Sequence, residues 1–352
     1  MKKIFVAMLA LAAATACSND ELVSVNQEAI GFDNAFINNS VRSVNDPSLT
    51  ATTLNDFQVY GYVENTPLFN AENIGVTVYK DGGNLSADKY AGQTKTNWKY
   101  EGTQYWIAGA NYAFHAVAPM TNGDWTKEPA TDVANTVINF TNDGETDLLY
   151  AYAVATGQVR DNQPIEFDFK HILSKIKISF ENAYNASTAT IKITDVKITN
   201  AHATGIATLN KTATTWDLAG VNTNKEIVFG AATEPEANYE NAYAFGTVYE
   251  AANERFVIPS AEYEFEISFV ANLYINGVQI DVNKEADGVN GYNHTAKAKF
   301  APQPGKSYDI KAVINAENID PENAQEAIEF TVKTLPGWGE TIPVDDEQVN
   351  VM

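Results

Sequence analysis

Alternation of apolar and polar side chains is the feature that most constrains the fold of this chain. In residues 263–269 the odd positions are apolar and the even positions polar, and residues 175–180, 191–193 and 328–333 also alternate between apolar and polar. Successive side chains of a strand point to opposite faces of a sheet, so each segment has one core face and one solvated face. This is the antiparallel pattern, because buried parallel strands are apolar throughout.

The alternating segments are short, and clusters of Asn, Gly, Asp and Thr separate them. The 17 Tyr and 17 Phe residues favour pleated, half-buried surfaces. A chain of 352 residues, 45% of them hydrophobic, is long enough for two domains of about 150 residues each. The sequence therefore predicts an all-β fold of two tandem β-sandwich domains, with one short turn of helix at residues 320–327.

The polar, turn-rich segment 157–164 marks the predicted domain boundary. Residues 100–119 before it predict paired strands near the end of a first sheet, and residues 165–169 after it predict a strand. We therefore place the division near residue 160, with an N-terminal domain at 43–160 and a C-terminal domain at 161–352.

Residues 1–16 are typical of an export signal. Two lysines precede an apolar stretch at residues 4–14, which is too short to span a bilayer as a permanent helix. Small residues then lead into Cys17, an order that resembles a bacterial lipoprotein signal, although Ala14 stands where that pattern prefers Leu. The resemblance implies that Cys17 is lipidated and becomes the new N-terminus. The alternative is an ordinary secretory signal with an accidental cysteine.

Charge and cysteine count exclude several classes of function. The formal net charge is −22, and a surface of that sign repels phosphate backbones, so we expect no nucleic-acid partner. Removing the signal deletes two lysines and no acid, which makes the charge more negative still. Cys17 is the single cysteine, so the chain forms no internal disulfide and no cysteine-based metal cluster.

Motifs for catalysis are absent from the sequence. The chain has four histidines, none paired at metal-ligand spacing, and it has no HExxH, GxSxG, P-loop or GxGxxG motif. Neighbouring acids such as Glu262, Glu264 and Glu266 lie on the solvated face of one alternating strand. We therefore expect no enzyme activity, no catalytic or metal-binding residues and no cofactor.

Two weaker binding hypotheses stay open at this point. The loop at residues 143–147 has oxygen ligands suited to calcium, but its Asp and Gly residues are equally typical of a turn. Trp98, Tyr100, Tyr105 and Trp106 form either an aromatic platform for sugars or a set of core and cross-strand contacts.

Several short motifs are spread along the chain. They are DLLYA at 147–151, FDFKHILSKI at 167–176, IGF at 30–32, VRS at 41–43, FQVYG at 57–61, WKY at 98–100, YW at 105–106, YAFHAVAP at 112–119 and GW at 337–338. Together they resemble the fimbrillin-like (type V pilin) proteins of Bacteroidetes, and the resemblance covers essentially the whole chain.

The resemblance implies a fimbrial structural or adhesive subunit with an N-terminal β-sandwich and a transthyretin-like C-terminal β-sandwich. It implies export as a palmitoylated lipoprotein to the outer membrane and the cell surface. It also implies that a trypsin-like, Arg-specific protease removes the first strand, and that a strand of another pilin subunit fills the vacated groove. The partners are then other pilins, the protease and a receptor on a host or bacterial surface.

The residues of segment 17–42 agree physically with such a removable strand. Ile30, Phe32 and Phe36 sit at even spacing, which predicts a strand with one buried face. Full burial of such side chains yields about 1.5–3 kcal/mol each, so three give roughly 5–9 kcal/mol gross. Removing the strand would expose apolar surface and an open sheet edge, which is a template for another chain.

Arg42 is the predicted cleavage site, and Ser43 is the predicted new N-terminus. No Arg or Lys lies between Lys3 and Arg42, and the next basic residue is Lys80. The surrounding residues 38–46 are polar and turn-prone, as an accessible cleavage site requires. The alternative is a lone solvated arginine.

The donor strand is left open. After Trp338, Ile342 alternates with Val344 and Val349 with Val351, but three acidic residues separate the two pairs. The tail is either a donor strand or an exposed terminus. The alternative function is a glycan-binding surface lipoprotein that never polymerises.

Overall fold

The chain is almost entirely β-structure in the residues that the structure describes. This computed structural model describes residues 28–37, 54–69, 75–119, 125–127, 133–185, 189–220, 223–230, 246, 248–280, 292–319 and 328–335. Helical structure in these ranges is limited to α1 (Ala316–Ile319) and a 3-10 turn (Ala87–Tyr90). The predicted all-β fold is confirmed. The turn of helix predicted at residues 320–327 lies outside the described residues.

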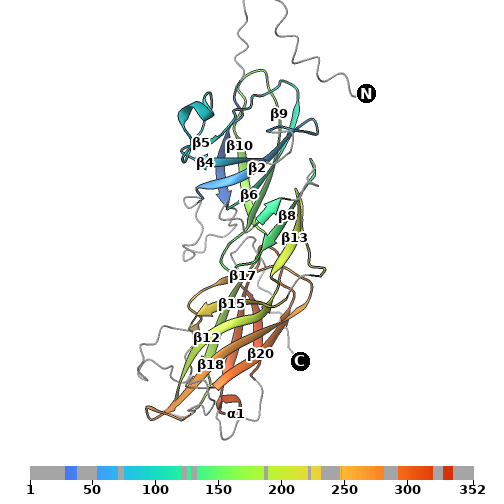
Figure 1. The fold of residues 1–352 in the computed structure, drawn as a ribbon. Coiled ribbons are helices and arrows are strands. Elements are labelled where there is room, and N and C mark those ends of the chain that lie inside the picture. Colours follow the sequence, from blue (N-terminus) through green and yellow to red (C-terminus); the bar gives the residue numbers. More distant parts are fainter. Residues whose placement is uncertain are drawn as a thin grey trace, which may run out of the picture.

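The first sheet has eight strands and lies at one end of the molecule (Figure 1). Its strands are β1 (Phe32–Ile37), β2 (Asp56–Val63), β3 (Thr66–Pro67), β4 (Val76–Lys80), β5 (Trp98–Tyr100), β6 (Asn111–Ala118), β9 (Leu149–Thr156) and β10 (Ile165–His171). They run in the order β1-β10-β9-β6-β2-β4-β5, with β3 paired to β2. The strand β1 is therefore an edge strand.

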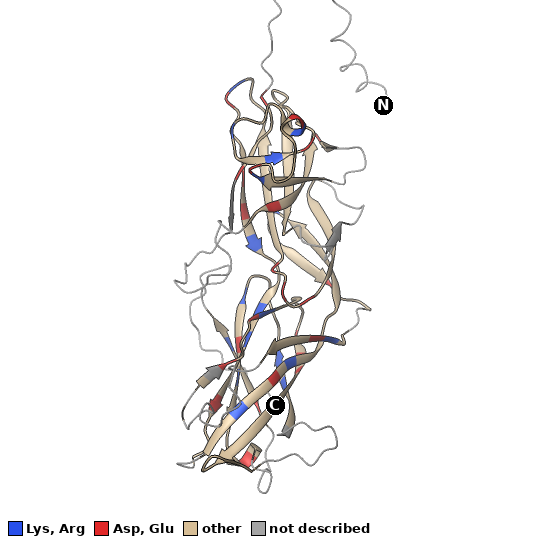
Figure 2. Ribbon diagram, turned by 60° about the vertical axis from the view of Figure 1, so that its left-hand side comes forward, with Lys and Arg blue, Asp and Glu red and all other residues tan. Residues whose placement is uncertain are grey.

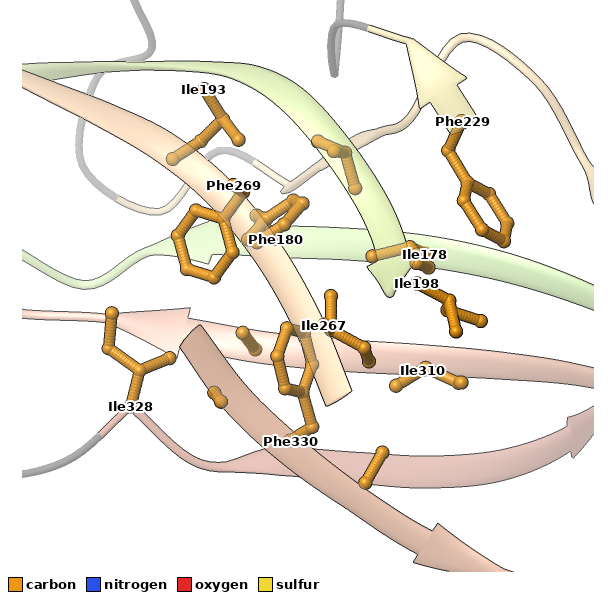
Figure 3. Close-up of a cluster of buried hydrophobic side chains, with 14 of the residues drawn as sticks. Ile178, Phe180, Ile193, Ile198, Phe229, Ile267, Phe269, Ile310, Ile328 and Phe330 are labelled. Atoms are coloured by element: carbon orange, nitrogen blue, oxygen red, sulfur yellow. The ribbon is translucent and has the colours of Figure 1, made fainter. Parts of the chain in front are cut away.

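Two five-stranded sheets lie at the other end. One contains β11 (Ser174–Asn182), β16 (Val248–Glu250), β17 (Arg255–Val257), β21 (Ser307–Ile314) and β22 (Phe330–Leu335). The other contains β12 (Ala189–Ala201), β15 (Lys225–Gly230), β18 (Tyr263–Ile275), β19 (Val278–Gln279) and β20 (Tyr292–Phe300). Apolar side chains of both sheets meet in one core, where Phe180, Phe269 and Phe330 contact one another (Figure 3). This arrangement is a β-sandwich.

A four-stranded sheet lies between the two ends (Figure 1). It contains β7 (Trp125–Lys127), β8 (Asn135–Thr141), β13 (Thr204–Asn210) and β14 (Thr214–Asp217). Strand β8 pairs with β13 although they are far apart in sequence. The division near residue 160 stays a prediction. Strand β10 follows that residue and nevertheless pairs in the first sheet.

Most ladders are antiparallel as predicted, but two are parallel, and for these the prediction is wrong. Strand β1 runs parallel to β10, and β11 runs parallel to β21. Alternation reports only whether one face of a strand is solvated. Strand β10 alternates strictly between buried and exposed residues although its β1 neighbour is parallel.

The pairing expected within residues 100–119 is also wrong. Strand β5 pairs with β4, whereas β6 pairs with β2 and β9. The two segments lie in one sheet without being neighbours, because β4 and β2 come between them.

Charged residues are spread over both ends of the molecule, with basic and acidic positions interleaved (Figure 2). Lys297 of β20 forms an ion pair with Glu264 of β18, and Lys299 of β20 pairs with Glu262, just before β18, at 2.6 Å in each case. These acids therefore act as cross-strand partners. No helix within the described ranges is long and apolar enough to cross a membrane.

Candidate functional site: the slot that holds the N-terminal strand

Residues 28–37 lie in a slot of the first sheet, and the two ends of this segment contact different parts of the chain. Strand β1 pairs in parallel with β10, with Phe32 opposite Ile165 and Phe36 opposite Asp168. Just before β1, the Ile30 amide donates to the Gln104 carbonyl oxygen at 2.8 Å, and the Trp106 amide donates to the carbonyl oxygen of Glu28 at 3.0 Å. We call the place between residues 104–106 and β10 the slot.

Phe32 fills the centre of the slot. Its side chain is fully buried, as is that of Ile30. The Phe32 ring lies against four other aromatic rings, with centroid distances from 5.3 to 6.4 Å: Tyr100, Phe114, Phe167 and Phe69. Aromatic pairs contribute about 0.5–1.5 kcal/mol beyond their buried area, so Phe32 is an apolar anchor of the segment.

The slot also binds the backbone of the segment. The Tyr100 hydroxyl donates to the Ile30 carbonyl oxygen at 2.9 Å and accepts from the Gln104 amide at 3.1 Å. Burial raises the pKa of Tyr100, which keeps the hydroxyl protonated as a donor. On the other side, the Ile165 amide donates to the Gly31 carbonyl oxygen at 2.8 Å. These contacts do not depend on the side chains of the bound strand.

Glu28 makes a set of charged contacts between the segment and the slot. Its carboxylate accepts hydrogen bonds from the Asn162 amide at 2.6 Å, the Asn162 side-chain nitrogen at 2.9 Å and the Asp161 amide at 3.1 Å. The Lys95 ammonium lies 3.4 Å away. The hydrogen bonds from Asn162 lower the pKa of Glu28 to about 2. We call these four donors the carboxylate cradle.

The loop at residues 158–162, which carries most of the cradle, is braced by hydrogen bonds that do not involve Glu28. The Asn162 side chain accepts from the Gln158 amide at 2.7 Å and donates to the Gln158 carbonyl at 3.0 Å. Lys95 donates to the Asn162 carbonyl at 2.5 Å. Asp161 has a φ of 61°, a left-handed conformation that Asp tolerates better than most residues. None of these contacts involves Glu28.

The sequence from residue 59 to residue 334 matches the model of a family described as fimbrillin-like. The chain belongs to the fimbrillin-like family. No curated protein sequence matches it.

Two solved structures to which the chain shows similarity are a fimbrial protein from Bacteroides vulgatus and a fimbrial assembly protein from Parabacteroides distasonis. The first is 16% identical, with a TM-score of 0.46, over 88% of this chain and 99% of that chain. The second is 11% identical, with a TM-score of 0.40, over 80% of this chain and 88% of that chain.

The predicted site residues of this fimbrillin-like chain fall into two groups. Ile30 and Phe32 lie buried in the slot, and Phe36 pairs with Asp168 through the backbone. Cys17, Arg42 and Ser43 lie outside the described residues, so lipidation and cleavage there remain predictions.

The histidines at two strand positions are packed in the fold. The His115 Nδ1 atom lies 2.8 Å from the Tyr150 hydroxyl, and the His171 Nδ1 atom lies 2.7 Å from an Asp147 carboxylate oxygen. Both histidines are buried. In the ranges that the structure describes, no cluster of three or more His, Cys, Asp or Glu side chains is placed to hold a metal ion.

The calcium and sugar hypotheses gain no support from the geometry. Asp143 accepts hydrogen bonds from the amides of Glu145 and Thr146, both at 2.7 Å, as in a turn. Of the four aromatic residues, Trp98, Tyr100 and Trp106 are buried, and only Tyr105 is exposed, at 42%. Three of the four therefore serve as core residues.

Sequence reasoning missed Glu28 and its cradle. The signal that was present is a repeated hexapeptide, because residues 27–32 read QEAIGF and residues 325–330 read QEAIEF. In the second copy, Ile328 and Phe330 are buried at the start of β22. In both copies the alternating apolar residues lead into an edge strand, β1 or β22.

Proposed function

We propose that this fimbrillin-like protein is an exported subunit of a fimbrium that assembles by exchange of its first strand. Residues 1–16 direct export, Cys17 receives the palmitate that holds the subunit at the outer membrane, and an Arg-specific protease cuts after Arg42. Residues 17–42 then leave the slot, and a strand of another pilin subunit enters it. The proposal includes the domains 43–160 and 161–352, the latter transthyretin-like.

The observation that carries this proposal is the position of β1. It is an edge strand, yet it contributes Phe32 to the centre of a core. Its departure would expose the rings around Phe32 and the free backbone edge of β10. Burial of an apolar side chain contributes about 1.5–3 kcal/mol, so an emptied slot favours binding of another strand. Open sheet edges pair readily with extended segments.

The test uses the purified full chain, an Arg-specific protease and electron microscopy. We expect polymers after cleavage, together with a mature chain that begins at Ser43 by N-terminal sequencing. The variant Arg42→Ala stays monomeric, whereas the control Arg160→Ala, at an arginine that the structure shows to be exposed, polymerises normally. Normal polymer from Arg42→Ala would reject this route of assembly.

The alternative of a glycan-binding lipoprotein that never polymerises has less support, because three of its four proposed aromatic residues are buried. A glycan array in which sugar binding is lost on changing Tyr105 would favour it. We propose no catalytic role for the chain, and its receptor would be a host or bacterial surface molecule.

A further inference from the structure

Most contacts in the slot do not fix the register of the strand that occupies it. Ile30 and Phe32 require apolar side chains at alternate positions, and the contacts of Tyr100, Gln104 and Ile165 are made to the backbone. A shift by one residue would turn the apolar side chains to the wrong face, but a shift by two would keep them on the correct face. A further contact is needed to exclude a two-residue slip.

The carboxylate cradle is the contact that distinguishes these registers. In the native register it holds the Glu28 carboxylate with three hydrogen-bond donors and the Lys95 ammonium. A slip by two residues would place an apolar side chain such as Ile30 there. The four donors would then face an apolar side chain and lose their charged acceptor, which is unfavourable.

The cradle also survives the departure of Glu28, because its loop is braced from within. Asn162 is held by both backbone groups of Gln158, and its carbonyl is held by Lys95. Two amides, a side-chain amide and an ammonium group therefore stay converged on one point. Such a group of donors is a ready-made site for a carboxylate.

We propose that this cradle is a carboxylate-binding site that sets the register of any strand in the slot. It takes a glutamate side chain of another subunit, placed two residues before the first buried apolar residue and four before the second, as Glu28 stands before Ile30 and Phe32. The residue between the two apolar ones need not be glycine. A Cβ atom on Gly31 would lie 3.5 Å from Thr96 Cγ2, an ordinary contact.

This inference rests on the proposed strand exchange, but its test does not need a polymer. A site for a sequence-specific protease replaces residues 44–49 in the full chain, and the folded protein is cut there. Fluorescent synthetic peptides of residues 26–37 then compete for the slot, and anisotropy reports their binding. The peptides are the native one, Glu28→Gln and the control Asp33→Asn, which also removes one negative charge.

We expect Glu28→Gln to weaken peptide binding at least about tenfold, because hydrogen bonds to a charged group are lost. Asp33→Asn is the charge-matched control: its effect on affinity, whatever its size, should be the same in the unaltered chain and in a Lys95→Met chain, since Asp33 lies outside the cradle. In a Lys95→Met chain, the difference in affinity between the native and Glu28→Gln peptides should shrink. This double-mutant cycle measures the coupling between Lys95 and Glu28. Equal binding of the native and Glu28→Gln peptides to the unaltered slot would overturn the proposal.

Register is read separately by disulfide trapping. The chain carries Cys17→Ser and Glu166→Cys, and peptides carry a cysteine at position 33, which is opposite Glu166 in the native register, or at position 35. The peptide with Glu28 should cross-link through position 33, whereas Glu28→Gln should lose that preference. Equal cross-linking at 33 and 35 with Glu28 present would contradict the assignment. Absence of polymers in the Arg42 experiment, by contrast, would reject strand exchange and leave the cradle intact.

Discussion

The rings of Phe32 and Phe167 stack with centroids 5.7 Å apart and planes inclined by 22°. Phe32 belongs to the strand that the proposed cleavage releases, and Phe167 belongs to β10, which stays. Both side chains are buried. This pair therefore joins the removable and the permanent parts of the first core, and its separation would leave an aromatic surface for another strand.

Phe32→Ala should destabilise the intact chain by about 3–5 kcal/mol, because it leaves a cavity among four rings. The measurement is urea unfolding of the full chain. Val154→Ala, at a side chain that is 60% exposed, is the matched control and should change stability by less than about 0.5 kcal/mol. Similar small effects from both variants would show that Phe32 does not anchor the strand.

Acid should loosen the strand through Glu28. Hydrogen bonds from Asn162 depress the folded-state pKa of this group from 4.5 to about 2. A depressed carboxyl pKa stabilises the fold above the unfolded value, so this contribution is complete above about pH 4.5 and is lost as pH falls towards 2. The Lys95 ammonium lies 3.4 Å from this carboxylate and is its ion-pair partner.

Hydrogen exchange of the Ile165 amide, which donates to Gly31, measures this loosening. Protection should fall more steeply between pH 5 and pH 2 in the natural chain than in Glu28→Gln. Other carboxyl groups titrate in the same range and affect both proteins alike. Parallel pH profiles for the two proteins would refute a role for Glu28.

Gly157→Ala should disturb the loop that carries the cradle. A Cβ atom there would lie 2.1 Å from the Ile107 carbonyl oxygen, so the backbone must shift. We expect a loss of about 1–3 kcal/mol in thermal unfolding. Gly31→Ala is the control, since its Cβ makes only ordinary contacts and the expected change is under about 1 kcal/mol. A tolerated Gly157→Ala would mean that the loop adapts freely.

Cys17→Ser should abolish incorporation of labelled palmitate in cells and release the protein from the outer-membrane fraction. A single acyl chain binds membranes only marginally, so more than one chain is expected on Cys17. Mass spectrometry of the mature N-terminus counts the chains. Unchanged membrane attachment of the Cys17→Ser variant would assign the anchor to another part of the chain.

Local patterns were sufficient to predict strands and insufficient to predict how they pair. The alternation at residues 263–269 predicted a strand, and β18 includes those residues and continues to Ile275. Strands β1 and β10 pair in parallel although they are far apart in sequence. The neighbouring contact between Glu28 and Asn162 spans 134 residues. Neither alternation nor turn chemistry carries information over such a distance.

The carboxylate cradle could not be predicted from the sequence for the same reason. Two of its donors are backbone amides, which every sequence supplies, and they converge only because Asn162 folds back onto Gln158. Ile30 and Phe32, in contrast, could be picked out as candidates from their spacing alone, because period-two alternation is a local property of a strand.

The most direct test of strand exchange is electron cryomicroscopy of fimbriae formed from this subunit, at a resolution that traces the strand beside β10. The account predicts that the slot holds a strand of a neighbouring subunit and that the resident chain starts at Ser43. A slot still filled by residues 28–37 of its own chain would contradict it.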